Sequence, residues 1–300
     1  MSIDLFPLTE AGNGGWDARV RVFHAGDEVD VFTVTTDRHL VLVDTTTTPE
    51  QARKIVGLVA ADLAGRSLLV VNTHADYDHA WGNCAFTEPI IGHRRTAEIL
   101  RDPETARQLE RRRAADPRFA GITLSPPSIT FEGALTIDGG DLTIELFEAI
   151  GHTRDQIALW IPEIRLLLAA DAAEHPFPHV ADSAGLFFVR ETLTKLNALD
   201  PRTVLACHGG TSDPGLPTRN LAYFDEVERH CRRALESGST QERLRAADDP
   251  GAAIGFGYDA ALRFAGTDPT LVDPFYRDFH RDALLATLDH LAGVTSAPGH

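Results

Sequence analysis

The chain has 300 residues, 43% of them hydrophobic and 24% charged, and its formal net charge is −16 at pH 7. This composition excludes a disordered chain, and the acidic balance argues against nucleic acid or an anionic membrane as partner, because both need a basic surface. Three cysteines without a C-x-x-C pair exclude a disulfide framework and a zinc ribbon. Since neither a signal peptide nor a membrane-spanning run is evident, we expect a cytoplasmic globular protein with a small-molecule substrate.

The first part of the chain changes from strand patterns to an alternation of helix and strand. Residues 18–46 contain short or alternating apolar runs broken by glycine and aspartate, which predict a β-meander. A helix is predicted over 48–65, with Pro49 near its start and Gly65 at its end. A buried strand, a short strand and one or two exposed helices are predicted to follow, at 67–74, 89–93 and 95–119.

A second strand-rich block spans residues 128–172, and its glycine and proline breaks are typical of hairpin turns. A helix at 190–199 and a buried strand at 202–210 follow. Strands followed by a helix thus occur twice, which suits two sheets packed face to face with helices outside. From Pro217 onward the patterns are helical. We expect this tail to dock on the core, and a lid or a homodimer surface is the alternative.

The segment VVNTHADYDHAWGN, residues 70–83, places four potential metal ligands behind an apolar run: His74, Asp76, Asp78 and His79. Like charges repel, and a buried carboxylate costs several kcal/mol unless a positive group neutralises it. Alternate residues of an extended segment point the same way, so His74 and Asp76 can bind one ion together. Further candidates stand at the ends of predicted strands: His152, Asp171 and His208. This pattern indicates strand ends that converge on a metal-binding cleft.

The order of these motifs resembles that of the metallo-β-lactamase superfamily. HADYDH is followed by a histidine, an aspartate and a His-Gly pair, each after a strand, and Asp44 in LVLVDTT matches an early Asp-bearing turn. The resemblance covers about residues 18–210. It implies an α/β fold, a four-layer αββα sandwich of two mixed β-sheets with outer helices. We therefore expect a core over residues 1–215 and a C-terminal helical extension, docked on the core, over residues 216–300.

The resemblance also implies a binuclear metal site. Its ligands would form two sets that share a bridging carboxylate: His74, Asp76 and His152 for one ion, Asp78, His79 and His208 for the other, and Asp171 between them. Asp76 stands where most members of the family have histidine. Because carboxylate oxygen is a harder ligand than imidazole, iron and manganese are the alternatives to zinc, which is the metal we expect.

Two divalent metal ions in this fold imply hydrolysis. A metal-bound hydroxide would attack an ester, thioester, lactone, amide or phosphoester bond of a small molecule, with Asp78 orienting it and accepting its proton. The alternatives are an iron-dependent redox enzyme of the same fold, suggested by Asp76, and a non-catalytic metal-binding protein. Residues expected to support the site or to contact the substrate are Asp44, Tyr77, Arg154 and His175. For Asp44 a supporting role is favoured over ligation, and for Tyr77 packing is favoured over catalysis.

Overall fold

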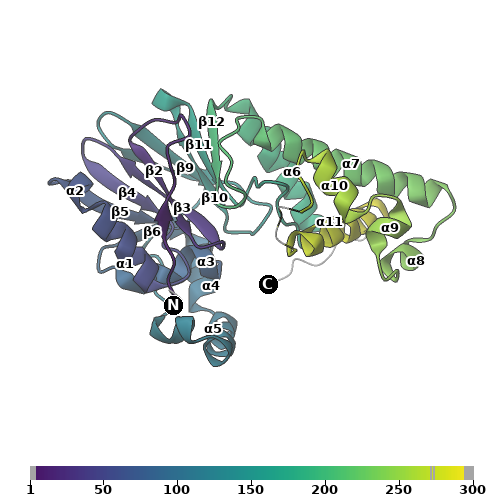
Figure 1. The fold of residues 1–300 in the computed structure, drawn as a ribbon, viewed down its shortest axis with the longest axis horizontal. Helices are drawn as coiled ribbons and strands as arrows, with labels where there is room; N and C mark the ends of the chain where they lie inside the picture. Colours follow the sequence, from purple (N-terminus) through teal and green to yellow (C-terminus); the bar gives the residue numbers. More distant parts are fainter. Residues whose placement is uncertain (1–4, 271, 273, 294–300) are drawn as a thin grey trace. The chain divides into compact units, whose positions relative to one another are not determined.

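The computed structural model describes residues 5–270, 272 and 274–293. Their contacts divide the chain into two compact units, each described by itself below. Unit 1 comprises Met1–Glu148 and Asp155–Ala170, and unit 2 comprises Ala149–Arg154 and Asp171–His300 (Figure 1). None of the helices in the described residues combines the length and the apolar character needed to span a lipid bilayer.

Unit 1 contains a seven-stranded sheet whose strands follow chain order from β1 to β7. The pairs from β1 to β4 are antiparallel and those from β4 to β7 are parallel, so the sheet is mixed and the predicted meander is confirmed. Its strands are β1 (Thr9–Glu10), β2 (Val20–Ala25), β3 (Val29–Thr35), β4 (His39–Val43), β5 (Ser67–Val71), β6 (Ile90–His93) and β7 (Ile129–Phe131).

The parallel pairing of β4 with β5 requires a crossover connection, and helix α1 (Pro49–Leu58) supplies it. The Thr48 side chain caps this helix by accepting a hydrogen bond from the Gln51 amide, and Pro49 occupies the first turn. The helix predicted over 48–65 is interrupted at Val59, after which α2 (Ala60–Leu63) begins. The predicted strand, helix and strand are therefore confirmed, with a break near the end of the helix.

The second sheet of unit 1 is a series of antiparallel pairs in the order β11-β10-β9-β8. Its strands are β8 (Ala134–Asp138), β9 (Thr143–Glu148), β10 (Ile157–Ile161) and β11 (Leu166–Ala170). Every residue of β10 and β11 is buried, which is why both segments are continuously apolar. β7 was expected in this strand-rich block, but it pairs in parallel with β6 of the first sheet.

Short helices complete unit 1: α3 (Tyr77–Ala80), η1 (Trp81–Ala85), α4 (Arg94–Arg101), α5 (Pro103–Ala115), η2 (Pro117–Gly121) and η3 (Pro162–Ile164), where η denotes a 3₁₀ helix. The charged segment predicted as one or two helices thus forms α4 and α5. Asp102 separates them, because its side chain caps α5 by accepting a hydrogen bond from the Glu104 amide.

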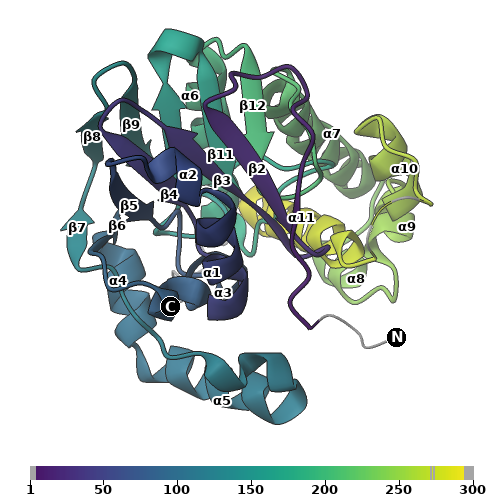
Figure 2. The ribbon, with the colours of Figure 1, turned by 60° about the vertical axis from the view of Figure 1, so that its left-hand side comes forward.

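Unit 2 is largely helical. It contains α6 (Ser183–Ala198), β12 (Thr203–Ala206), α7 (Leu216–Glu236), α8 (Gln241–Arg245), α9 (Pro250–Ile254), α10 (Tyr258–Phe264) and α11 (Tyr276–Leu291). Helices α6, α7 and α11 pack against one another (Figure 2). In their core the Phe177 ring stacks on Tyr223 at 4.2 Å between centroids, and Tyr276 meets Phe177 edge-on. Helix α6 begins before its predicted start because Asp182 caps it.

The predicted tail begins where α7 begins, at Leu216. Unit 2 also includes α6 and β12, which precede that position. The division into a core over residues 1–215 and an extension over 216–300 stays a prediction, as do the lid and the homodimer surface.

Candidate metal centre

Unit 1 holds a cluster of potential ligands in the turn between β5 and η1. His74 and His79 are fully buried, and their ring centroids lie 4.0 Å apart. Asp78 is buried, whereas the side chain of Asp76 is 48% exposed. The Ile157 amide donates a hydrogen bond of 2.9 Å to the Thr73 carbonyl, which ties the start of this turn to the second sheet. The structure therefore brings together the four residues predicted from HADYDH.

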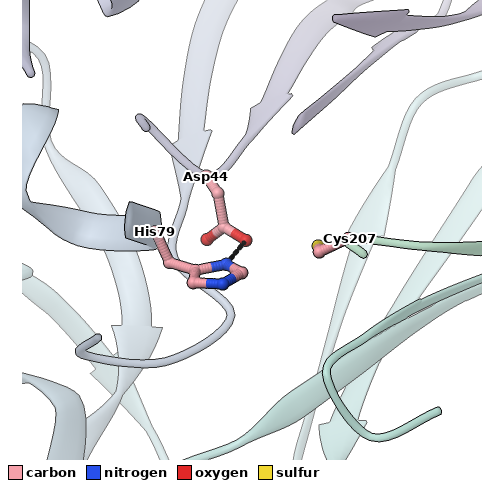
Figure 3. Close-up of side chains that lie close together, drawn as sticks. All are labelled: Asp44, His79 and Cys207. Atoms are coloured by element: carbon pink, nitrogen blue, oxygen red, sulfur yellow. Dashed lines mark hydrogen bonds and ion pairs between the residues drawn. The ribbon is translucent and has the colours of Figure 1, made fainter. Parts of the chain in front are cut away.

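Asp44 lies beneath this cluster as a fully buried carboxylate at the end of β4, with φ of 66°. Its Oδ1 accepts a hydrogen bond from the Thr73 amide at 2.7 Å. Its Oδ2 accepts a hydrogen bond from the Thr73 hydroxyl at 2.7 Å. The same oxygen pairs with Nδ1 of His79 at 2.9 Å (Figure 3). One carboxylate thus holds both the backbone and the side chains of the turn, which is the supporting role expected for it.

These hydrogen bonds determine which ring nitrogens point away from Asp44. His79 donates from Nδ1 to Asp44, so its Nε2 is the atom left to bind a cation. The Thr73 hydroxyl gives its only hydrogen to Asp44, so its oxygen accepts from Nδ1 of His74 at 3.0 Å. Nε2 is therefore the nitrogen of each ring that could bind a cation.

The distances within the unit 1 cluster fit the edges of a coordination polyhedron. Nε2 of His74 lies 3.6 Å from Oδ2 of Asp76, and Nε2 of His79 lies 3.7 Å from Oδ2 of Asp78. Both distances exceed the range of a hydrogen bond. Two ligand atoms bound tetrahedrally at about 2.1 Å from one zinc ion are about 3.4 Å apart. Each of the two pairs therefore fits two ligands of a divalent cation.

Unit 2 holds a second cluster, formed by the three remaining predicted ligands. Oδ2 of Asp171 lies 3.6 Å from Nε2 of His152 and 3.3 Å from Nε2 of His208. Both distances are close to the ligand spacing given above, so Asp171 with either histidine fits two ligands of a divalent cation. Asp171 is buried, and the same oxygen, Oδ2, lies near both histidine rings.

Glycines adjacent to the two unit 2 histidines allow the chain to approach its neighbours closely. A Cβ atom on Gly151, which precedes His152, would lie 2.6 Å from Cα of Val189. A Cβ atom on Gly209, which follows His208 with φ of 86°, would overlap the carbonyl oxygen of His175. Side chains at these positions would push both histidine loops outward.

Glu174 joins the unit 2 cluster, although it was not among the predicted residues. Potential ligand atoms of Glu174, His152 and Asp171 all lie within 4.8 Å of one another. Burial, together with the nearby negative charge of Asp171, raises the pKa of Glu174 to about 7. The available signal in the sequence was an acidic residue three positions after Asp171, inside the small and apolar segment LLLAADAAE.

The other three candidates are Tyr77, His175 and Arg154. The Tyr77 ring packs against Trp81 and carries the Arg112 guanidinium 3.7 Å above it, and burial raises the pKa of Tyr77 to about 12. His175 is half-buried, its Nε2 lies 3.0 Å from the Thr267 hydroxyl, and burial lowers its pKa. Arg154 is half-buried in the segment after His152.

The fold and the two clusters are those expected of a metal-binding α/β protein, and comparison with known families identifies its superfamily. Residues 25–208 match the family model described as the metallo-beta-lactamase superfamily. This match covers more than half of the chain, so the chain belongs to that superfamily. The resemblance inferred from the motif order is confirmed, and with it the α/β fold of two β-sheets and helices.

Among individual relatives, the chain is 25% identical over 185 residues to the acyl-coenzyme A thioesterase MBLAC2 of Gallus gallus. That match covers 57% of this chain and 66% of the relative, which is just under two thirds of its length.

Solved structures agree on the fold. The metallo-beta-lactamase from Pontibacter korlensis superposes with a TM-score of 0.55 at 18% identity, over 72% of this chain and 98% of that one. The metallo-beta-lactamase DIM-1 gives a TM-score of 0.53 at 17% identity, over 72% of this chain and 97% of that one. At these identities the likeness shows the fold alone.

Proposed function

We propose that the protein is a metal-dependent hydrolase that cleaves a thioester of a small molecule. The observation that carries the proposal is the pair of clusters in which imidazole Nε2 atoms and carboxylate oxygens lie at ligand spacing. Membership of the metallo-beta-lactamase superfamily supports the hydrolytic class. Among the bonds considered, the thioester is favoured because the relative from Gallus gallus is described as an acyl-coenzyme A thioesterase.

The proposed ligands are those expected from the sequence: His74, Asp76, Asp78, His79, His152, Asp171 and His208. Divalent cations supply Lewis acidity and make water acidic enough to act as a nucleophile near neutral pH. Asp44 and Thr73 hold His74 and His79 with Nε2 oriented for binding. Asp78 orients the attacking water and takes up its proton, because it is a buried carboxylate in the turn that carries both histidines.

Zinc is the proposed metal, with a binuclear site as the family motif implies. Asp76 replaces an imidazole by an oxygen ligand, which moves the preference toward iron or manganese relative to a site with histidine there. This observation also favours a second candidate function, an iron-dependent redox enzyme of the same fold.

A panel of substrates tests both candidates. Protein loaded with zinc, manganese or iron is offered one representative thioester, ester, lactone, amide and phosphoester, and the released thiol, acid, amine or alcohol is measured. We expect thioester cleavage that chelation abolishes. Failure to cleave the thioester with any of the three metals would contradict the proposal. Oxygen consumption by the iron form in place of hydrolysis would support the redox candidate.

A further inference from the structure

Glu174 is held rigidly in the interior of unit 2. Its amide donates a hydrogen bond of 3.0 Å to Oδ1 of Asn220, and its carbonyl accepts one of 2.8 Å from Nδ2 of the same residue. The Tyr276 hydroxyl donates to Oε2 at 3.1 Å. Helices α7 and α11 thus fix the backbone and one carboxylate oxygen, and the side chain is buried.

The second carboxylate oxygen of Glu174 remains to be satisfied. Oε1 is buried, and within the part of the chain that the structure describes it has no hydrogen-bond partner. Glu174 belongs to the group with His152 and Asp171 in which one potential ligand atom of each residue lies within 4.8 Å of the others. A buried carboxylate next to another carboxylate is costly unless a cation or a proton neutralises it.

We propose that Oε1 of Glu174 is an additional ligand of the divalent cation held by His152 and Asp171 in unit 2. The inference rests on the proposed metal-dependent function and adds a ligand that the family motif does not contain. Tyr276 is then a positioning residue, because its hydrogen bond to Oε2 leaves Oε1 for the cation. Glu174 would add a second hard oxygen ligand beside Asp171. The preference for Mn²⁺ over Zn²⁺ should therefore be stronger than with His152 and Asp171 alone.

The test is equilibrium binding of Mn²⁺ alone and of Zn²⁺ alone, measured by chelator competition on the full chain. Glu174→Gln keeps the size of the side chain and an oxygen that can accept from Tyr276, but it removes the charge. We expect it to weaken binding of the cation held by His152 and Asp171 at least roughly 10-fold. The loss of affinity should be larger for Mn²⁺ than for Zn²⁺. Glu191→Gln, an exposed change on α6 of the same unit, is the matched control and leaves both affinities unchanged.

A second variant keeps the proposal testable if Glu174→Gln does not fold. Tyr276→Phe retains the carboxylate and removes only the hydroxyl that orients it, so we expect a smaller loss of affinity for the same ion. Metal-free Glu174→Gln should melt no lower than metal-free wild type, because the change removes repulsion with Asp171.

The outcomes separate this inference from the proposed function. Unchanged Mn²⁺ and Zn²⁺ binding in folded Glu174→Gln or in Tyr276→Phe would overturn the ligand role, and Glu174 would then carry a proton. That result would leave the metal-dependent function intact. A wild-type chain that binds neither ion would overturn the proposed function itself.

Discussion

Asp44 orients both histidines of the unit 1 cluster through three hydrogen bonds. Asp44→Ala would leave the Thr73 amide and Nδ1 of His79 buried without an acceptor. We expect the metal-free protein to lose about 3 kcal/mol or more of unfolding free energy, and metal affinity to fall roughly 10- to 100-fold. Chemical denaturation and chelator competition measure these two effects.

The control for this change is Asp138→Ala, which removes an exposed carboxylate paired with Arg38 on β8. It should leave both the unfolding free energy and metal binding nearly unchanged. Equal effects of the two changes would show that Asp44 does not support the cluster.

Titration of a single residue, His280, should make the stability of the fold depend on pH. Its Nε2 donates to the Phe256 carbonyl at 2.7 Å, and its Nδ1 accepts from the Tyr223 hydroxyl at 2.9 Å. Burial lowers the pKa of His280 to about 4, while the charges of Asp249 and Arg277 act in opposite directions. The unfolded chain therefore binds a proton below pH about 6.5, whereas the folded chain does so only near pH 4.

Stability should fall as the pH decreases through this window. Between pH 7.5 and 5 the wild type should lose about 2 kcal/mol more unfolding free energy than His280→Gln, which can make both hydrogen bonds but does not titrate. Denaturant titrations at the two pH values measure the difference. Parallel losses in the two proteins would mean that His280 is not held neutral by the fold.

Some residues of the candidate site could be predicted from the sequence, and others could not. The candidate ligands were predicted because each follows a strand in a fixed order, and their ligation stays a prediction. Glu174 could not be predicted, because its importance comes from contacts with Asn220 and Tyr276, which lie far along the chain. Thr73 was missed for a similar reason, since its hydroxyl matters only through the hydrogen bonds that link Asp44 to His74.

At the scale of elements, η1 must lie against the segment that follows β4. A Cβ atom on Gly82 would overlap the Thr45 carbonyl, and the Gly82 amide donates to the Thr46 carbonyl at 3.0 Å. Gly82→Ala should therefore cost about 1–3 kcal/mol through overpacking and displace the neighbouring turn of ligands. Thermal unfolding and metal affinity measured on the same samples would detect both effects.

Gly57→Ala is the matched control, because nothing lies within 4 Å of the added methyl group and the residue is exposed in α1. This change should stabilise the protein by about 0.5–1 kcal/mol, since alanine favours helix. If Gly82→Ala proved as harmless as Gly57→Ala, η1 would not be packed as described.

Local patterns predicted the kind of element better than its partner. The segment containing β7 has the strand pattern that was expected, but alternation does not specify which sheet a strand joins. It pairs with β6 because the chain returns past α5 and η2 to the edge of the first sheet. The break at Val59 was hidden for a related reason, because apolar spacing continues across it.

At the scale of the whole molecule, the order of five short motifs was enough to predict the superfamily. The contacts nevertheless group residues 149–154 with 171–300, and this division has no local signal such as a linker. A compact unit is defined by contacts between distant segments, which composition and periodicity do not describe. The identity of the substrate cannot be predicted from local patterns either, because substrate specificity depends on side chains gathered from many elements.

The most direct test of the metal-dependent function is a titration of chelator-stripped protein with Zn²⁺, in which bound metal and thioester hydrolysis are measured on the same sample. We expect no hydrolysis without metal and a rate that rises with bound zinc to a plateau. The double variant His79→Ala, His208→Ala should lose both properties, whereas His290→Ala, an exposed change on α11, should keep both. Hydrolysis at the wild-type rate in the stripped protein or in the double variant would contradict the account.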